Sequence, residues 1–187
     1  MAVLCDSELL ATLDAGQLEV DPKPPVDHFT PCSIDLTLGV ELKRWKPAGG
    51  ITIDPADPKF NFAQIASSLL EPMPLDSTGA VVINPQEFLL GITHERVHLP
   101  SSSRLCARVE GRSTLARLGL GVHVTAPTIH AGWNGKIALE IAHHGNVPIR
   151  LVPGLRICQL IVEQLFGTPR ARLRTAFQNQ TTVKGPL

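Results

Sequence analysis

The stretch from Val109 to Ile141, VEGRSTLARLGLGVHVTAPTIHAGWNGKIALEI, combines features that no other part of the chain brings together. Closely spaced glycines, two arginines that flank a hydroxyl pair, and a single acid inside an apolar run, Glu140, all lie within it. Glycine allows sharp turns and exposes backbone amides. The stretch therefore predicts a turn-rich segment with cationic and hydroxyl groups, followed by a strand that carries one carboxylate.

The first half of this stretch predicts an anion-binding turn. Ser113 is a plausible N-cap for a short helix over residues 113–118, which Gly119 would close. A helix start attracts phosphate, and Arg112 would add a charge-assisted contact. On this pattern alone, the alternative is a glycine-punctuated β-hairpin that carries one structurally satisfied glutamate.

The second half, residues 136–141, reads KIALEI and predicts a strand with Glu140 buried among apolar neighbours. A buried carboxylate without a full partner exchanges protons more readily near neutral pH than an exposed one. We therefore regard Glu140 as a candidate proton shuttle.

Composition around this stretch restricts the class of protein. A chain of 187 residues suits one domain over 1–187, with an N-terminal helix and linker at 1–25 and a C-terminal tail or lid at about 168–187. Lysine plus arginine equal aspartate plus glutamate at 17 each, so no overall charge favours nucleic acid or an anionic membrane. The four cysteines form no C-x-x-C pair, and no signal segment or membrane-spanning run is present, which predicts a cytoplasmic setting.

Short apolar runs separated by turn residues predict a mainly β fold. Sixteen prolines and fifteen glycines break the chain into these runs, as in jelly-roll-like architectures. A helix is expected over residues 6–16, with Asp6 or Ser7 as its cap, and a helical turn within an insertion at 60–70. Strands are expected at 33–38, 79–83, 87–92, 104–109, 149–152 and 156–163.

The segment His94–His98 spells H-E-x-x-H, which on a helix would place two histidines on one face as zinc ligands. Here it follows an apolar run typical of a strand, Thr93 directly before it is β-branched, and so is Val97 within it. Residues four apart on a strand are ~13 Å apart, which is too far for one zinc ion. We therefore interpret the segment as a strand end.

Several motifs resemble the dCTP deaminase branch of the dCTP deaminase and dUTPase superfamily. The most specific is GRSTLARLGL at 111–120, followed by HVTA at 123–126, GWNG at 132–135 and the pair Leu139-Glu140. Similar pieces occur at 4–6 (LCD), 22–25 (PKPP), 33–39 (SIDLTLG), 84–88 (NPQEF) and 153–160 (PGLRICQL). The resemblance implies a distorted jelly-roll or dUTPase-like β-barrel with a short N-terminal helix and few other helical turns.

The same resemblance implies zinc-independent hydrolytic deamination of dCTP to dUTP and ammonia, which feeds dUMP and dTTP synthesis. In the family picture, Ser113 and the main-chain carbonyl of Ala126 position a water, and Arg117 helps to fix the arrangement. Glu140 takes the proton of this water as it attacks C4 of the cytosine. The chain lacks the H-x-E and P-C-x-x-C segments of zinc-dependent nucleobase deaminases, so no zinc is expected.

The nucleotide contacts are also implied by resemblance. They comprise Arg112, Ser113, Thr114, Leu115, Ala116, Arg117, His130, Ala138, Leu139 and Gln180. Arg112, Ser113 and Thr114 would hold the triphosphate, with Mg²⁺ bridged by substrate phosphates rather than held in a protein cage. The family further implies a homotrimer with the nucleotide between subunits, and dTTP as a candidate inhibitor.

Two of the chain's departures from the family bear most directly on the activity. Residues 129–130 are Ile-His where the family usually has Ile-Asp, and the tail segment AFQNQ at 176–180 keeps a glutamine but has no lysine or tyrosine. Three alternatives therefore accompany the main hypothesis: a bifunctional enzyme that converts dCTP to dUMP, a deaminase of another or modified pyrimidine nucleotide, and a non-catalytic nucleotide-binding homologue. His130 counts against the first, and the intact Glu140 counts against the last.

Overall fold

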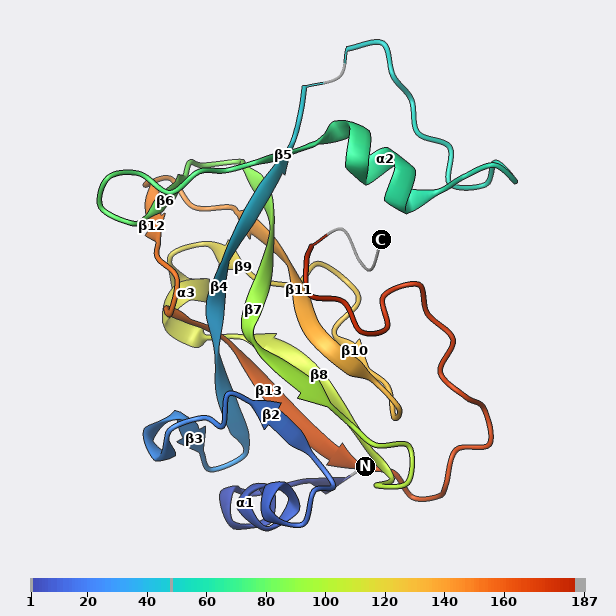
Figure 1. Ribbon diagram of the computed structural model, residues 1–187. Helices are drawn as coiled ribbons and strands as arrows, with labels where there is room; N and C mark the ends of the chain where they lie inside the picture. The colour runs from blue at the N-terminus through green and yellow to red at the C-terminus, as the bar shows by residue number, and fades with distance from the viewer. Residues whose placement is uncertain (1, 48, 184–187) are drawn as a thin grey trace.

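The computed structural model describes residues 2–47 and 49–183 of the chain. Eleven strands in the described part form one curled antiparallel sheet, in which the order β10-β8-β13-β4-β7-β11-β9 forms the main path and β1, β2, β3 and β5 add to its margins (Figure 1). A separate two-stranded sheet pairs β12 with β6. The predicted mainly β fold is confirmed.

The strands are short except for those at the centre of the sheet. Their bounds are β1 Ala2–Val3, β2 Glu19–Asp21, β3 Phe29–Thr30, β4 Ser33–Trp45, β5 Leu70–Pro72, β6 Val81–Ile83, β7 Phe88–His98, β8 Leu105–Gly111, β9 Leu120–Gly121, β10 Thr128–Ile129, β11 Asn134–His143, β12 Ile149–Leu151 and β13 Arg156–Gln164. The helices are α1 Asp6–Asp14, the 3-10 turn η1 Val26–His28, α2 Phe62–Leu69 and α3 Ser113–Arg117.

The long strand β4 joins the two halves of the sheet. Its first residues pair with β13, and its later residues pair with β7 and β5. Between these parts the register with β7 shifts, and the chain crosses β7 so closely at Gly39 that a Cβ there would lie 2.9 Å from the Ile92 carbonyl oxygen. The strand predicted at 33–38 is therefore too short, because the buried first half of β4 continues past this bend to Trp45.

The main hydrophobic core lies inside the curl of the sheet. Apolar side chains from alternating positions of β4, β8, β11 and β13 fill it, and α1 closes one end with Leu9. A second, smaller cluster lies under α2 at the opposite end of the molecule. Within the described part of the chain, no helix is both long and apolar enough to cross a membrane.

Two expected helix caps are wrong. α1 begins after Cys5, whose backbone N–H donates to the Glu8 carboxylate at 3.4 Å, rather than at a cap formed by Asp6 or Ser7. In α3, Arg112 occupies the N-cap position and Ser113 is the first helical residue, with no side-chain cap hydrogen bond. The Ser113 hydroxyl is therefore not engaged in capping. The helical turn expected within 60–70 is present as α2.

Candidate functional site

Glu140 lies on β11 at a position whose side chain points away from the core. Its neighbours Leu139 and Ile141 are buried in the main cluster, whereas the Glu140 carboxylate is half-buried on the other face of the strand. The expectation of a buried Glu140 is therefore wrong, because the period of two along the strand turns this residue away from the core. It faces two recesses instead.

The first recess is an apolar cavity of about 290 Å³. Its lining comes from β11, from the loop before β11, from α2 and from the C-terminal tail. The lining residues are Phe62, Leu90, Val109, His123, Ala126, Pro127, Thr128, Ile129, His130, Trp133, Ile137, Ala138, Leu139, Glu140, Leu173, Thr175, Phe177, Gln180 and Val183. An apolar recess with a few polar groups, including one carboxylate, is the usual form of a small-molecule site.

The structure brings several predicted site residues to this cavity. Ala126, His130, Ala138 and Leu139 line it together with Glu140. Gln180 is also there, although it is 40 residues further along the chain; it is only 4% exposed, and its Nε2 donates to the Lys136 carbonyl oxygen at 2.8 Å. The Gln180 Oε1 atom is buried with no hydrogen-bond partner among the described residues.

The second recess is more open, about 580 Å³, and adjoins the first at Glu140 and Ala126. His143 lines it and is 1% exposed. The Gly145 backbone N–H donates to His143 Nδ1 at 3.2 Å, so Nδ1 carries no proton, and Nε2 must be the atom that donates to the Val147 carbonyl oxygen at 2.8 Å. Sequence analysis did not find this residue, since a histidine at a strand end gives no signal of the loop that it organises.

The predicted phosphate-binding residues lie elsewhere. Ser113, Thr114, Ala116 and Arg117 are exposed on α3, Leu115 packs against the core, and none of them lines either recess beside Glu140. One chain therefore presents the predicted site as two separate surfaces, which we call the cavity and the α3 surface.

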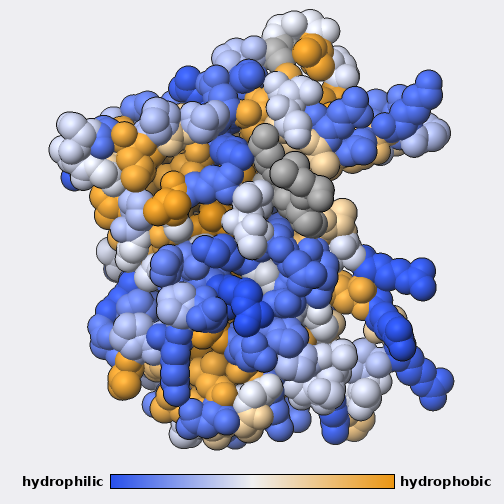
Figure 2. Space-filling view, in the orientation of Figure 1, coloured by the Kyte–Doolittle hydropathy of each residue, from blue (hydrophilic) through white to orange (hydrophobic). Residues whose placement is uncertain are grey.

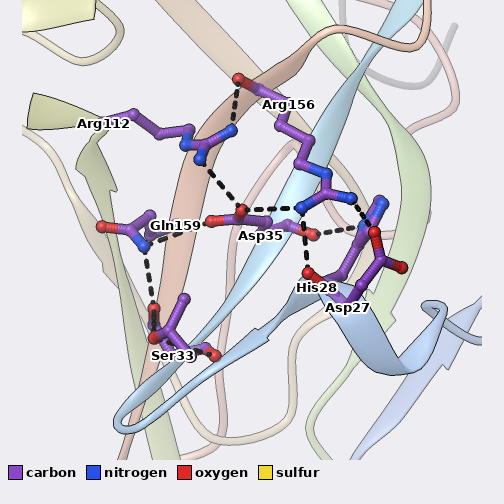
Figure 3. A network of polar contacts seen from close by, with 8 residues as sticks. Asp27, His28, Ser33, Asp35, Arg112, Arg156 and Gln159 are labelled. Atoms are coloured by element: carbon purple, nitrogen blue, oxygen red, sulfur yellow. Dashed lines mark hydrogen bonds and ion pairs between the residues drawn. The ribbon is translucent and has the colours of Figure 1, made fainter. Parts of the chain in front are cut away.

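Arg112 connects the α3 surface to a buried polar network (Figure 3). Its Nη2 lies 3.4 Å from Oδ2 of Asp35, a residue that is only 2% exposed, and Arg156 approaches the same oxygen at 3.8 Å. Gln159 Nε2 donates to the other Asp35 oxygen at 3.1 Å. Two cations and an amide thus satisfy one buried carboxylate.

Arg156 extends this network to the surface by pairing with Asp27. The hydrogen-bonded guanidinium holds the pKa of the Asp27 carboxyl below its usual range. The direction of Arg112 is consequently fixed, because its partner Asp35 is itself held by Arg156 and Gln159.

The H-E-x-x-H segment forms the end of β7, as its context predicted. Its side chains alternate, so Glu95 is buried while His94 is exposed. Both oxygens of Glu95 accept hydrogen bonds from Thr37, at 2.9 Å from the backbone N–H and 2.7 Å from the hydroxyl. This glutamate secures β7 to β4 at the bend.

His123, which is not among the site residues predicted from the sequence, also lines the cavity. Its Nε2 lies 3.5 Å from Glu110, and its Nδ1 is buried with no hydrogen-bond partner among the described residues. Phe62 and Phe177 are two further lining residues that the sequence did not identify.

Comparison with known proteins agrees with this architecture. A family model described as dCTP deaminase-like matches residues 3–165. The chain therefore belongs to the dCTP deaminase family, which confirms the predicted resemblance.

Two relatives, from Methanobrevibacter smithii and Methanosphaera stadtmanae, carry the name dCTP deaminase, dUMP-forming. Each is 38% identical over 165 residues, which cover 88% of this chain and 81% and 80% of theirs. A crystal structure of 2'-deoxycytidine 5'-triphosphate deaminase from Agrobacterium tumefaciens has a TM-score of 0.65 at 23% identity, and the match covers 86% of this chain and 47% of that one. The similarity to this crystal structure supports the assignment of the fold.

Proposed function

We propose that the chain is a dCTP deaminase that carries its substrate on to dUMP. The observation that carries the deamination step is the position of Glu140, which faces an apolar cavity beside Ala126 and the partnerless Gln180 oxygen. The dUMP-forming product is supported by the two relatives of that name at 38% identity. These two relatives therefore favour the bifunctional alternative, with dUMP as product, over the release of dUTP that the sequence favoured.

The deamination proceeds by general base catalysis. A water held by Ser113 and the Ala126 carbonyl attacks C4 of the cytosine, and Glu140 takes its proton. Glu140 passes this proton to N3, and it then takes the proton of the new hydroxyl on C4 and gives it to the amino group. The C4–N bond breaks, the C4 carbonyl forms, and ammonia leaves. Arg117 helps to hold this arrangement, and the product of the step is dUTP.

The second step is hydrolysis of the bond between the α- and β-phosphates, which yields dUMP and pyrophosphate from dUTP and water. Arg112, Ser113 and Thr114 are the proposed phosphate ligands. The nucleotide would pack against the side chains of Leu115, Ala116, Ala138 and Leu139. The Oε1 atom of Gln180 would accept a hydrogen bond from it. Release of dUTP as the final product is the second candidate function, because His130 at the cavity cannot supply a carboxylate to orient the hydrolytic water.

The two surfaces of one chain favour a site shared between copies. The α3 surface and the cavity do not meet within a chain, yet the proposed water requires Ser113 and Ala126 together. A second copy that brings its α3 surface to the first copy's cavity satisfies this requirement, as the homotrimer implied by the family would do.

Magnesium fits this proposal as part of the substrate. Within residues 2–47 and 49–183, no three His, Cys, Asp or Glu side chains gather in a way that could hold a metal ion, and Asp35 already faces two arginines. The triphosphate oxygens would therefore supply the ligands, in keeping with the ion's preference for phosphates. By family resemblance, dTTP would compete at the same site as an inhibitor.

The test is incubation of purified protein with dCTP and Mg²⁺ after exhaustive removal of zinc, with products separated by chromatography. Accumulation of dUMP, pyrophosphate and ammonia is the expected result. Accumulation of dUTP would establish the second candidate, and absence of ammonia release would overturn the deaminase assignment.

A further inference from the structure

Two segments that are far apart in the sequence together cover the cavity. One is the arm, defined here as residues 49–69 and ending in α2, and the other is the tail, defined as residues 168–183. Figure 1 shows the tail looping out on the right and returning across β11 beneath α2. In the space-filling view, a gap opens at the right edge between the arm above and the hydrophilic side chains of the looped-out part of the tail below (Figure 2).

The tail is attached to β11 by backbone and side-chain hydrogen bonds. The Asn179 N–H donates to the Asn134 carbonyl at 2.7 Å, and the Lys136 N–H donates to the Gln180 carbonyl at 3.0 Å. Beyond these, the Val183 N–H donates to the Glu41 carboxylate at 3.1 Å. The tail is therefore held by hydrogen bonds to other parts of its own chain.

The arm meets the tail through aromatic rings. Phe62, near the start of α2, lies edge-on to Phe177 with ring centroids 5.7 Å apart and edge-on to Trp45 at 6.4 Å. Such pairs are favourable beyond the area they bury. Phe62 also packs on the second hydrophobic cluster, which consists of Ala66, Leu70, Leu90, Ile92 and Val183.

Phe62 thus contacts the tail through the ring of Phe177 and through the cluster that contains Val183. Gln180 lies between these two tail residues and lines the cavity that Glu140 faces. Phe177 is already 36% exposed, so loss of its ring partner would leave little apolar contact at that point.

We propose that Phe62 is a positioning residue that latches the tail and thereby holds Gln180 across the cavity. The latch itself rests on geometry, whereas the meaning of Gln180 for a nucleotide rests on the proposed function. While the latch is closed, the tail covers the cavity on the side that faces α2, and movement of the tail away from α2 uncovers that side.

Limited trypsin digestion of the intact protein tests the latch without any assay of activity. Arg170 and Arg174 are exposed, but the residues after Arg174 lead directly into the docked part of the tail. Cleavage after Arg174 therefore requires local opening, while cleavage after Arg170 serves as an internal reference. We expect Phe62→Ala to accelerate cleavage after Arg174 by about tenfold relative to cleavage after Arg170.

Matched variants separate the latch from general loosening. Phe60→Ala changes an exposed phenylalanine of the same arm and should leave both cleavage rates unchanged, and Phe62→Tyr should restore the slow rate by keeping the ring. Because Phe62 acts in part through Phe177, the double variant with Phe177→Ala should open less than the product of the two single effects. Equal acceleration at Arg170 and Arg174, or no acceleration at all, would overturn the proposal.

Turnover provides the second readout. With dCTP, Phe62→Ala should raise KM about tenfold and change kcat by less than about threefold, because the tail acts in binding. A fall in kcat at unchanged KM would contradict a role in holding the tail. If the unaltered protein does not turn over dCTP but the digestion results hold, the latch stands and the proposed function fails.

Discussion

Glu140 shows how a single position on a strand determines what a carboxylate can do. Its neighbours on either side are in the core, and the alternation of the strand turns the Glu140 side chain away from the core to face the cavity. A half-buried acid at the edge of an apolar recess can reach both a water molecule and a bound base. A fully buried one would have been a structural group.

Replacing Glu140 by Gln should abolish ammonia release, by at least about a hundredfold, because the amide keeps the shape of the side chain but cannot take a proton. Binding of dCTP, measured by calorimetry, should change little. Glu71→Gln is a suitable control, since Glu71 on β5 pairs with Arg44 on β4 and does not line the cavity. Ammonia release at the unaltered rate would remove Glu140 from the mechanism.

The four thiols should differ in reactivity according to burial. Desolvation raises the pKa of the wholly buried Cys158 thiol, and raises that of the partly buried Cys106 as well. Because the thiolate is the reactive form, a raised pKa keeps Cys158 protonated and inert at pH 8. A disulfide reagent should therefore label exposed Cys5 and Cys32 first and Cys158 only on unfolding, as followed by mass spectrometry. Rapid labelling of Cys158 in the folded protein would contradict this burial.

At the scale of elements, the turn after α3 rests directly on the loop after β11. Gly119 has a φ of +89°, and a Cβ there would lie 2.3 Å from the Gly145 nitrogen. The His144 N–H donates to the Gly119 carbonyl at 2.7 Å, and the His143 ring shapes the same loop. The position of α3 is thus tied to the strand that carries Glu140.

Gly119→Ala should destabilise the protein by about 2–4 kcal/mol, because a clash with backbone adds to the strain of a positive φ. Gly154→Ala separates the two effects, since Gly154 has a φ of +85° but open space around it, and should cost about 1 kcal/mol. Denaturant unfolding provides both values. Equal losses would mean that the contact with Gly145 contributes nothing.

The sequence predicted the helices and strands better than it predicted the contacts between them. Strand alternation and glycine punctuation located most strands, and the family motifs identified Ala126, His130 and Glu140, which do share a cavity. The contact between Phe62 and Phe177 could not be predicted, because it depends on how an insertion and a tail fold back over the sheet. The burial of Asp35 was hidden for a related reason, since both faces of early β4 are covered.

At the scale of the whole molecule, the separation of the cavity from the α3 surface makes a prediction about mixtures. Glu140→Gln and Ser113→Ala proteins should each be inactive alone. If each site takes Glu140 from one copy and Ser113 from another, unfolding and refolding an equal mixture should restore about a quarter of normal activity.

Restoration would be measured as ammonia release, with the two variants refolded separately as the control. The shared site would be ruled out if the refolded mixture stayed inactive while mass measurement showed that mixed assemblies had formed.

The position of β13 also has a consequence for synthesis of the chain. This last long strand lies between β8 and β4, both of which leave the ribosome well before it. Until residue 164 has emerged, β4 and β8 each expose an unpaired edge, which invites pairing with other chains. The nascent protein therefore cannot close its sheet progressively, and protection of these edges by a chaperone would matter most in the interval before β13 is made.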